Sequence, residues 1–255
     1  MRGGIDLAYA VMALPVALFL VPWPEAHYWP ILIGAFAIHS GYKLLQAAAY
    51  ARGAYTVVYP VVRGTGPLFT VIGAYFVFDE TFTLGQWGGL AVLLAGIFGL
   101  ALWNLQKVTK GRETMVMALV LAALTGAVVA GYTTYDAWAI RQTPNPFTFL
   151  AWFFVIDGLL MPFVTRNTLI ALPREDWIPF TKKAVLGALV AYISFGAILI
   201  ATRIGNVGEA AVIRETSTVF AALIGWLVLG ERSGPQKIAL MALIAAGAVI
   251  VKFAG

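Results

Sequence analysis

Long apolar runs, separated by short polar loops, dominate the chain. A helix that crosses a bilayer needs roughly 20 apolar residues. By this criterion the pattern predicts nine membrane-spanning helices, and the loops between them are too short to hold a soluble domain. The predicted helices cover residues 5–22, 30–51, 54–78, 86–104, 114–138, 147–170, 183–203, 206–229 and 236–253.

The two halves of the chain resemble each other at a constant offset of 151 residues. This offset relates residues 54–80 to residues 205–231 and joins Arg63 to Arg214. It also carries the last four predicted helices onto the first four. The fifth helix has no counterpart, so the second half has one helix more than the first. We therefore expect a five-plus-five design whose first helix is missing, either because the sequence starts late or because the helix was lost.

The predicted repeats cover residues 1–106, with four helices, and residues 113–255, with five. Because each complete repeat has an odd number of helices, the second must enter the membrane from the opposite side. The fold class is therefore an all-α polytopic helical bundle with an inverted repeat, which places a substrate site near the membrane midplane. The alternative is a duplication that was kept only for packing.

Composition agrees with a membrane protein. Of the 255 residues, 61% are hydrophobic and 11% are charged, whereas about 25% of residues are charged in soluble domains. The chain has no cysteine, which excludes disulfides, thiolate metal ligands and cysteine nucleophiles. The net charge of +5 does not indicate nucleic-acid binding, because the basic residues lie in short loops.

The loop charges predict an orientation. The side that holds Met1 has ten loop Lys or Arg residues and the other side has three. The positive-inside rule then places Met1 in the cytoplasm and, with nine helices, the C-terminus outside. We expect a multi-pass protein of the bacterial inner membrane.

Residues 212–251 carry a polar cluster in a helix, then Gly230-Glu231, then a last helix rich in Ala and Gly. This segment resembles the C-terminal signature of the EamA-like transporters of the drug/metabolite transporter superfamily. Residues 124–141 are also similar to that family, and the resemblance extends over the whole chain. It implies a ten-helix inverted repeat with a central cavity and a transport function. It also implies that both termini are cytoplasmic, which conflicts with the loop charges.

Several polar residues are predicted to lie deep in the membrane, where a charge costs roughly 2.5–3.5 kcal/mol on insertion scales. Glu215 is expected to point away from Arg214 and to reach Lys43 or Arg63. The alternative is a set of structural ion pairs. The candidate substrate-binding residues are His39, Lys43, Tyr59, Arg63, Tyr132, Asp157, Arg214 and Glu215.

The deep charges have an excess of one positive charge, which favours a substrate with a carboxylate or phosphate, since Arg grips either group with two hydrogen bonds. Other charges are predicted to lie at helix ends: Asp136, Arg203 and Glu209 are expected to pair there. Glu80 and Glu231 are expected to cap or brace helices. The Gly64, Gly66 and Pro67 run is expected to loosen its helix, or only to kink it for packing.

These features favour a secondary transporter that works by alternating access, in which Asp157 or Glu215 takes up a proton. A lipid-phosphate flippase is the main alternative, followed by a membrane enzyme and by a scaffold or sensor. No GxxxxGK[ST], HExxH or GxSxG motif is present, so ATP drive and enzyme activity are not expected. The expected partners are a small-molecule substrate and the lipid bilayer; no cofactor, metal or nucleic acid is expected, and a homodimer is left open.

Overall fold

The computed structural model describes residues 1–107, 114–220, 224 and 234–255. These residues are almost entirely helical and include no strand. The helices are α1 (Arg2–Phe19), η1 (Ala26–Tyr28), α2 (Trp29–Tyr50), α3 (Tyr55–Phe78), α4 (Leu84–Lys107), α5 (Met115–Gln142), α6 (Pro146–Asp157), α7 (Leu160–Val164), α8 (Arg166–Ile170), η2 (Arg174–Asp176), α9 (Trp177–Ile204), α10 (Val207–Arg214) and α12 (Pro235–Phe253).

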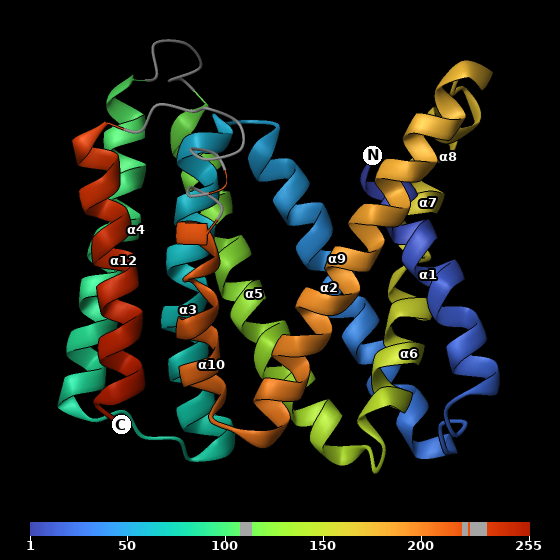
Figure 1. The fold of residues 1–255 in the computed structure, drawn as a ribbon, viewed down its shortest axis with the longest axis horizontal. Helices are drawn as coiled ribbons and strands as arrows, with labels where there is room; N and C mark the ends of the chain where they lie inside the picture. Colours follow the sequence, from blue (N-terminus) through green and yellow to red (C-terminus); the bar gives the residue numbers. More distant parts are fainter. Residues whose placement is uncertain (108–113, 221–223, 225–233) are drawn as a thin grey trace. The chain divides into compact units, whose positions relative to one another are not determined.

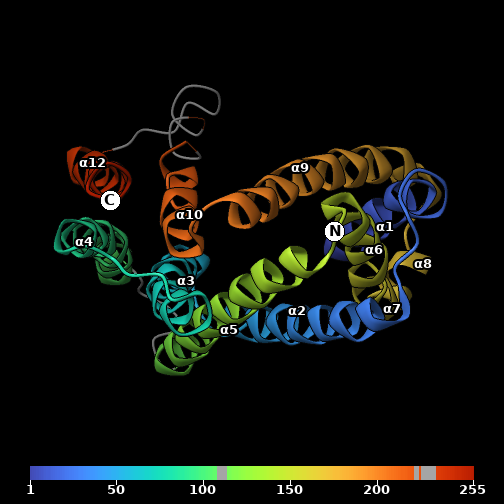
Figure 2. The same ribbon diagram turned by 90° about the horizontal axis from the view of Figure 1, so that it is seen from below.

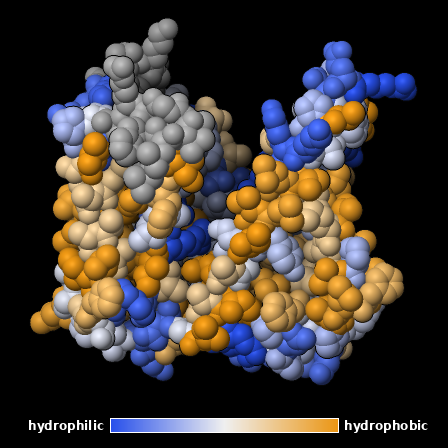
Figure 3. Space-filling view, viewed as in Figure 1, coloured by the Kyte–Doolittle hydropathy of each residue, from blue (hydrophilic) through white to orange (hydrophobic). Residues whose placement is uncertain are grey.

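Seven segments of the described chain are long and apolar enough to cross a membrane. The all-α polytopic fold class is therefore confirmed. The number of nine spans stays a prediction, because most of the second half of the predicted helix over residues 206–229 lies outside the described residues. Figure 3 shows the membrane character on the surface: hydrophobic residues cover the sides of α9 and α12, and hydrophilic ones gather near helix ends.

The predicted helix over residues 147–170 is broken. The structure has α6, a turn at Gly158 and Leu159, and then the short helices α7 and α8. Pro162 explains the turn, because a proline has no N–H with which to bond the carbonyl four residues earlier, here that of Gly158.

The described helices form two compact units. Unit 1 contains Met1–Ser40 and Tyr135–Ile204; unit 2 contains Gly41–Thr134 and Gly205–Gly255. Helices α2 and α5 contribute residues to both units. These spatial units are not the sequence halves, because each takes segments from both predicted repeats.

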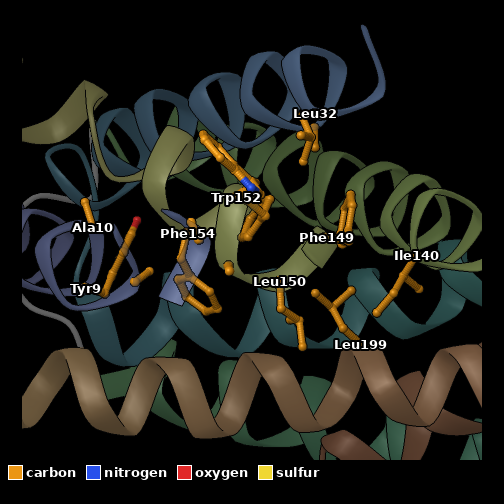
Figure 4. Close-up of a cluster of buried hydrophobic side chains, with 14 of the residues drawn as sticks. Tyr9, Ala10, Leu32, Ile140, Phe149, Leu150, Trp152, Phe154 and Leu199 are labelled. Carbon is orange, nitrogen blue, oxygen red and sulfur yellow. The ribbon is translucent and has the colours of Figure 1, made fainter. Parts of the chain in front are cut away.

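In unit 1, α1 packs against α6 and α9. The α6 sequence is apolar all round, as expected for a helix buried on most sides. Its side chains interleave with Tyr9 of α1 and Leu199 of α9 (Figure 4). The Tyr9 and Phe154 rings meet edge to face with centroids 5.1 Å apart.

In unit 2, α4 lies side by side with α12, and α3 with α10 (Figures 1 and 2). The α4 and α12 backbones approach closely at Gly89 and Gly247. A Cβ atom on Gly247 would lie 2.5 Å from the Leu93 backbone nitrogen and 2.6 Å from the Gly89 carbonyl oxygen. Small residues permit this approach, which favours helix association in lipid through van der Waals contact.

Side chains fix two helix starts in unit 2. Thr83 and Gln86 form a reciprocal capping box at α4: the Thr83 N–H donates to Gln86 Oε1 at 2.9 Å, and the Gln86 N–H donates to Thr83 Oγ1 at 3.2 Å. The Glu80 carboxylate accepts hydrogen bonds from the N–H groups of Val207 and Gly208 at the start of α10. The predicted capping role of Glu80 is thus confirmed, while Glu231 lies outside the described residues.

Candidate functional site

A cavity of about 200 Å³ opens within unit 2. Helices α2, α3, α5 and α10 contribute to its wall. Its wall combines three tyrosines, two arginines and one carboxylate with apolar side chains. The lining residues are Tyr42, Gln46, Tyr59, Val62, Arg63, Gly66, Pro67, Val129, Tyr132, Arg214 and Glu215.

Helix α10 ends at the charged residues of this cavity. It finishes at Arg214, and the backbone continues through a tight turn in which the Glu215 N–H bonds the Val212 carbonyl at 3.0 Å and the Thr216 N–H bonds the Ile213 carbonyl at 3.0 Å. These bonds span three residues rather than four, as in a 3₁₀-helix, and a 3₁₀ stretch in a longer helix often marks a functional hinge. This turn was not predicted, because the expected loosening concerned the run after Arg63 in the first half of the chain.

Helix α3 behaves differently. It stays helical from Tyr55 to Phe78 through the Gly64, Gly66 and Pro67 run, so the predicted loosening does not break it. Pro67 nevertheless lacks the N–H that would bond the Arg63 carbonyl in a regular helix. Arg63 therefore sits at a local interruption of the helical hydrogen bonds, directly on the cavity wall.

Arg63 and Glu215 form an ion pair across the cavity wall. Arg63 Nε lies 2.8 Å from Glu215 Oε2, and the two side chains are 14% and 5% exposed. Arg63 also donates hydrogen bonds to the Ser217 hydroxyl and, at 3.4 Å, to the Arg214 carbonyl. The prediction that Glu215 reaches Arg63 is confirmed. Ser217 was not predicted, although it lies on the same polar run of the sequence.

Tyrosines surround the arginines. Arg214 is hydrogen-bonded to the side chain of Tyr132. The Tyr132 ring meets the Tyr42 ring edge to face at 5.2 Å, and the Arg63 guanidinium lies 5.8 Å from the centre of the Tyr59 ring. Five of the eight predicted site residues thus line one cavity: Tyr59, Arg63, Tyr132, Arg214 and Glu215.

The charges on the cavity wall suit an anion. Arg63 and Arg214 provide two positive charges and Glu215 provides one negative charge, so the wall has an excess of one positive charge. Guanidinium groups offer planar, paired donors that match carboxylate and phosphate oxygens. Among the described residues, no group of three or more His, Asp or Glu side chains could hold a metal ion.

The other three candidates are not on this wall. Lys43 is buried on α2 in unit 2, with 5% of the residue exposed. In unit 1, His39 Nε2 lies 2.7 Å from Asp136 Oδ2, and the Tyr9 hydroxyl donates to Asp157 Oδ2 at 2.5 Å.

The prediction for Asp136 was wrong. It does not pair at a helix end; it is only 1% exposed and bonds His39. The reason is that α5 runs to Gln142, four residues beyond the predicted end, so Asp136 lies farther inside the helix. The other two end charges pair as expected: Glu209 binds Lys252 at 2.6 Å, and Arg203 donates to the Thr143 carbonyl at 2.7 Å.

Tyr42 was among the aromatic residues that the sequence indicates could line a cavity, and it does, whereas Gln46 was not singled out as a site residue. They lie four residues apart on α2, where the Gln46 amide donates to the Tyr42 hydroxyl at 2.7 Å. This spacing places two side chains on the same helix face. The spacing of four residues from Tyr42 was the available signal for Gln46.

Comparison with known proteins places the chain in a family. The uncharacterised protein y4nH of Sinorhizobium fredii is 30% identical over 99 residues, which are 39% of this chain and 82% of that protein. A protein of known crystal structure shares the fold, with a TM-score of 0.73 and 16% identity, over 100% of this chain and 87% of the other. The model of the EamA-like transporter family, part of the drug/metabolite transporter superfamily, matches residues 116–253. This match covers more than half of the sequence, and the chain belongs to the EamA-like transporter family.

Proposed function

We propose that this protein is a secondary transporter that moves a small metabolite by alternating access. The substrate carries a carboxylate or a phosphate, alone or in a zwitterion. The observation that carries the proposal is the cavity in which Arg63 and Arg214 flank one carboxylate, Glu215. Its volume of about 200 Å³ is below the range of roughly 300–1,000 Å³ typical of drug-sized ligands, which favours a small substrate.

Glu215 supplies a route to coupling. The Glu215 carboxylate is the counterion of Arg63, so an anionic substrate has to replace this carboxylate on the guanidinium. A buried pair that loses one partner without replacement is destabilised by roughly 3–5 kcal/mol, because a charge is left uncompensated. A displaced Glu215 avoids this cost by taking a proton. Substrate binding and proton uptake then occur together.

The packing of unit 2 supports the inverted repeat. The Gly89 contact with Gly247 has a counterpart between Gly96 and Leu240, and an offset of 151 residues exchanges the two contacts. Such an exchange is the pattern of a two-fold interface, in which residue i meets j and j meets i.

The arginines fit the same symmetry. Arg63 donates to the carbonyl of Arg214, its own counterpart at the offset of 151 residues. A residue that meets its counterpart lies near the two-fold axis, so the cavity lies beside this axis. Transporters with inverted repeats bind substrates at the repeat interface. The repeat bounds at residues 1–106 and 113–255 and the inner-membrane location belong to this proposal.

The test is transport by the purified full chain in liposomes. Uptake of radiolabelled inorganic phosphate, succinate and leucine covers an inorganic anion, a dicarboxylate and a zwitterion. Arg63→Ala and Arg214→Ala should each lower the uptake of the transported compound about 10- to 100-fold, since a hydrogen bond to a charged group contributes roughly 1.5–3 kcal/mol. Arg174→Ala, in the exposed turn η2, is the matched control and should transport like the wild type.

If the wild type takes up one of these compounds and both arginine variants take it up at the same rate, this cavity is not the substrate site. A wild-type protein that moves none of the three compounds would contradict the proposed substrate class. Circular dichroism and monodispersity of each variant separate loss of function from loss of folding.

A further inference from the structure

We propose that His39 and Asp136 form a proton-binding site that couples proton movement to transport. The proton-binding half of this inference stands on unit 1 alone. The coupling half rests on the proposed transport function. Neither residue lines the cavity of unit 2, so the site is additional to the one described above.

The His39–Asp136 pair is buried and joined by a short hydrogen bond. His39 Nε2 and Asp136 Oδ2 are 2.7 Å apart, and the side chains are 6% and 1% exposed. The His39 ring packs edge to face against two aromatic rings that stack on each other, with centroids 4.8 Å from Phe153 and 5.5 Å from Phe195. Water is therefore largely excluded from the imidazole.

Burial makes the charge of the pair depend on one proton. With a neutral imidazole and an ionised Asp136 the pair carries a net negative charge; with one more proton its net charge is zero. A buried ionised carboxylate is costly unless it is paired. The closed, dry site therefore favours the loaded state, and exposure to water lowers the cost of releasing the proton.

The charged groups around the His39–Asp136 pair also favour binding of a proton. Asp157 of α6 is close enough to Asp136 to repel it, and Tyr9 of α1 donates to Asp157. One turn earlier on α1, Asp6 is paired with Arg2 at 2.8 Å. The Asp136 Oδ1 atom is buried without a hydrogen-bond partner, which leaves an acceptor open for a proton or a water molecule.

Other titratable groups lie near the pair in the part of the chain that the structure describes. Tyr135, next to Asp136, donates its hydroxyl to the Ile31 carbonyl at 3.0 Å. Tyr192 of α9 stacks on Phe154 at 4.5 Å. Lys43 follows His39 by four residues on α2 and is a cation on the same helix face.

The helices that carry His39 and Asp136, α2 and α5, also contribute residues to the cavity wall. On α2, Tyr42 follows His39 by three residues; on α5, Tyr132 precedes Asp136 by four residues. Each step is about one helical turn. Tyr42 and Tyr132 contact each other and line the cavity. A change in the His39–Asp136 bond thus acts on the same two helices that position these tyrosines.

The chain offers a direct test, because it has two histidines. His27 is 62% exposed at its side chain and serves as an internal control. We would titrate ¹⁵N-histidine-labelled full-length protein in nanodiscs by NMR between pH 5 and 9. His39→Gln and His27→Gln assign the two signals.

We expect both histidine signals to titrate. Asp136→Asn should weaken proton binding at His39 about tenfold, a shift of about one pH unit to lower pH, because the neighbouring negative charge is lost. The His27 midpoint should not change. A His39 signal that stays constant while His27 titrates would overturn the proton site, as would a His39 midpoint that Asp136→Asn leaves unchanged.

The coupling half is measured with the pH dye pyranine inside liposomes, while gradients of phosphate, succinate or leucine are imposed. The wild type should move protons with the transported compound. Asp136→Asn and His39→Gln should still exchange that compound between the two sides but move fewer protons with each molecule, because Glu215 is then the remaining proton-binding group of the proposal. Transport by the wild type without any proton movement would overturn coupling and leave the transport function standing. A wild type that transports none of the three compounds would instead remove the proposed function, and the NMR titration would decide the proton site alone.

Discussion

At the scale of single residues, Glu215 decides the charge of the cavity. Glu215 is 4% exposed, and its carboxylate pairs with Arg63 of α3 on the cavity wall. The pair keeps the wall at an excess of one positive charge. An ionised Glu215 competes with an anionic substrate, whereas a protonated Glu215 does not.

Glu215→Gln should therefore bind the transported anion more tightly and lose its dependence on pH. In the wild type, a fall in pH should increase anion binding as Glu215 takes up its proton. In the variant, binding should stay at the higher level, with half-saturation at a concentration about tenfold lower, which corresponds to about 1.4 kcal/mol. The measurement is the concentration dependence of uptake at several pH values.

Glu209→Gln is the control for this change. Glu209 also pairs with a cation, Lys252, but that side chain is 58% exposed, and such surface pairs contribute at most about 1 kcal/mol. The control should keep the wild-type affinity and pH dependence. Equal behaviour of the two variants would rule out a specific role for Glu215.

At the scale of elements, backbone contact holds α4 against α12. The lipid gives helices no hydrophobic reason to associate, so close van der Waals packing at small residues takes its place. Gly89 and Gly247 meet through backbone atoms. No side-chain rotation can make room there.

Gly247→Ala should lower stability by about 1–3 kcal/mol, as overpacking does, because its Cβ would lie 2.5 Å from the Leu93 backbone nitrogen. Gly88→Ala is the matched control on α4. A Cβ there meets nothing within 4 Å, so the change should be neutral or stabilise the helix by up to about 1 kcal/mol. Thermal unfolding in one detergent compares the two. An unchanged melting temperature for Gly247→Ala would contradict the close contact.

At the scale of the whole molecule, the loop charges predict which side of the membrane each loop faces. The chain has no cysteine, so each introduced cysteine is the only one. Gln142 and Lys182 are both exposed and lie on opposite predicted sides. In intact cells, a membrane-impermeant maleimide should label Gln142→Cys.

Lys182→Cys should react only after the cells are permeabilised, because the side rich in Lys and Arg stays in the cytoplasm. The readout is the mass shift of the labelled protein. Labelling in the reverse order would invert the predicted orientation and would agree with the alternative topology implied by the family.

The sequence by itself determined the class of the molecule, most helix bounds and five residues of the cavity. Apolar length and the scarcity of charge are local properties, and the cost of a charge in lipid singles out Arg63 and Arg214 before any fold is known. The tertiary structure decided the partners. It paired His39 with Asp136, 97 positions apart in the chain, and it brought Glu215, for which the sequence left Lys43 and Arg63 open, to Arg63. It also broke the helices at Arg214 and Asp157. These outcomes depend on which helices pack together, and neither helix periodicity nor sequence spacing carries that information.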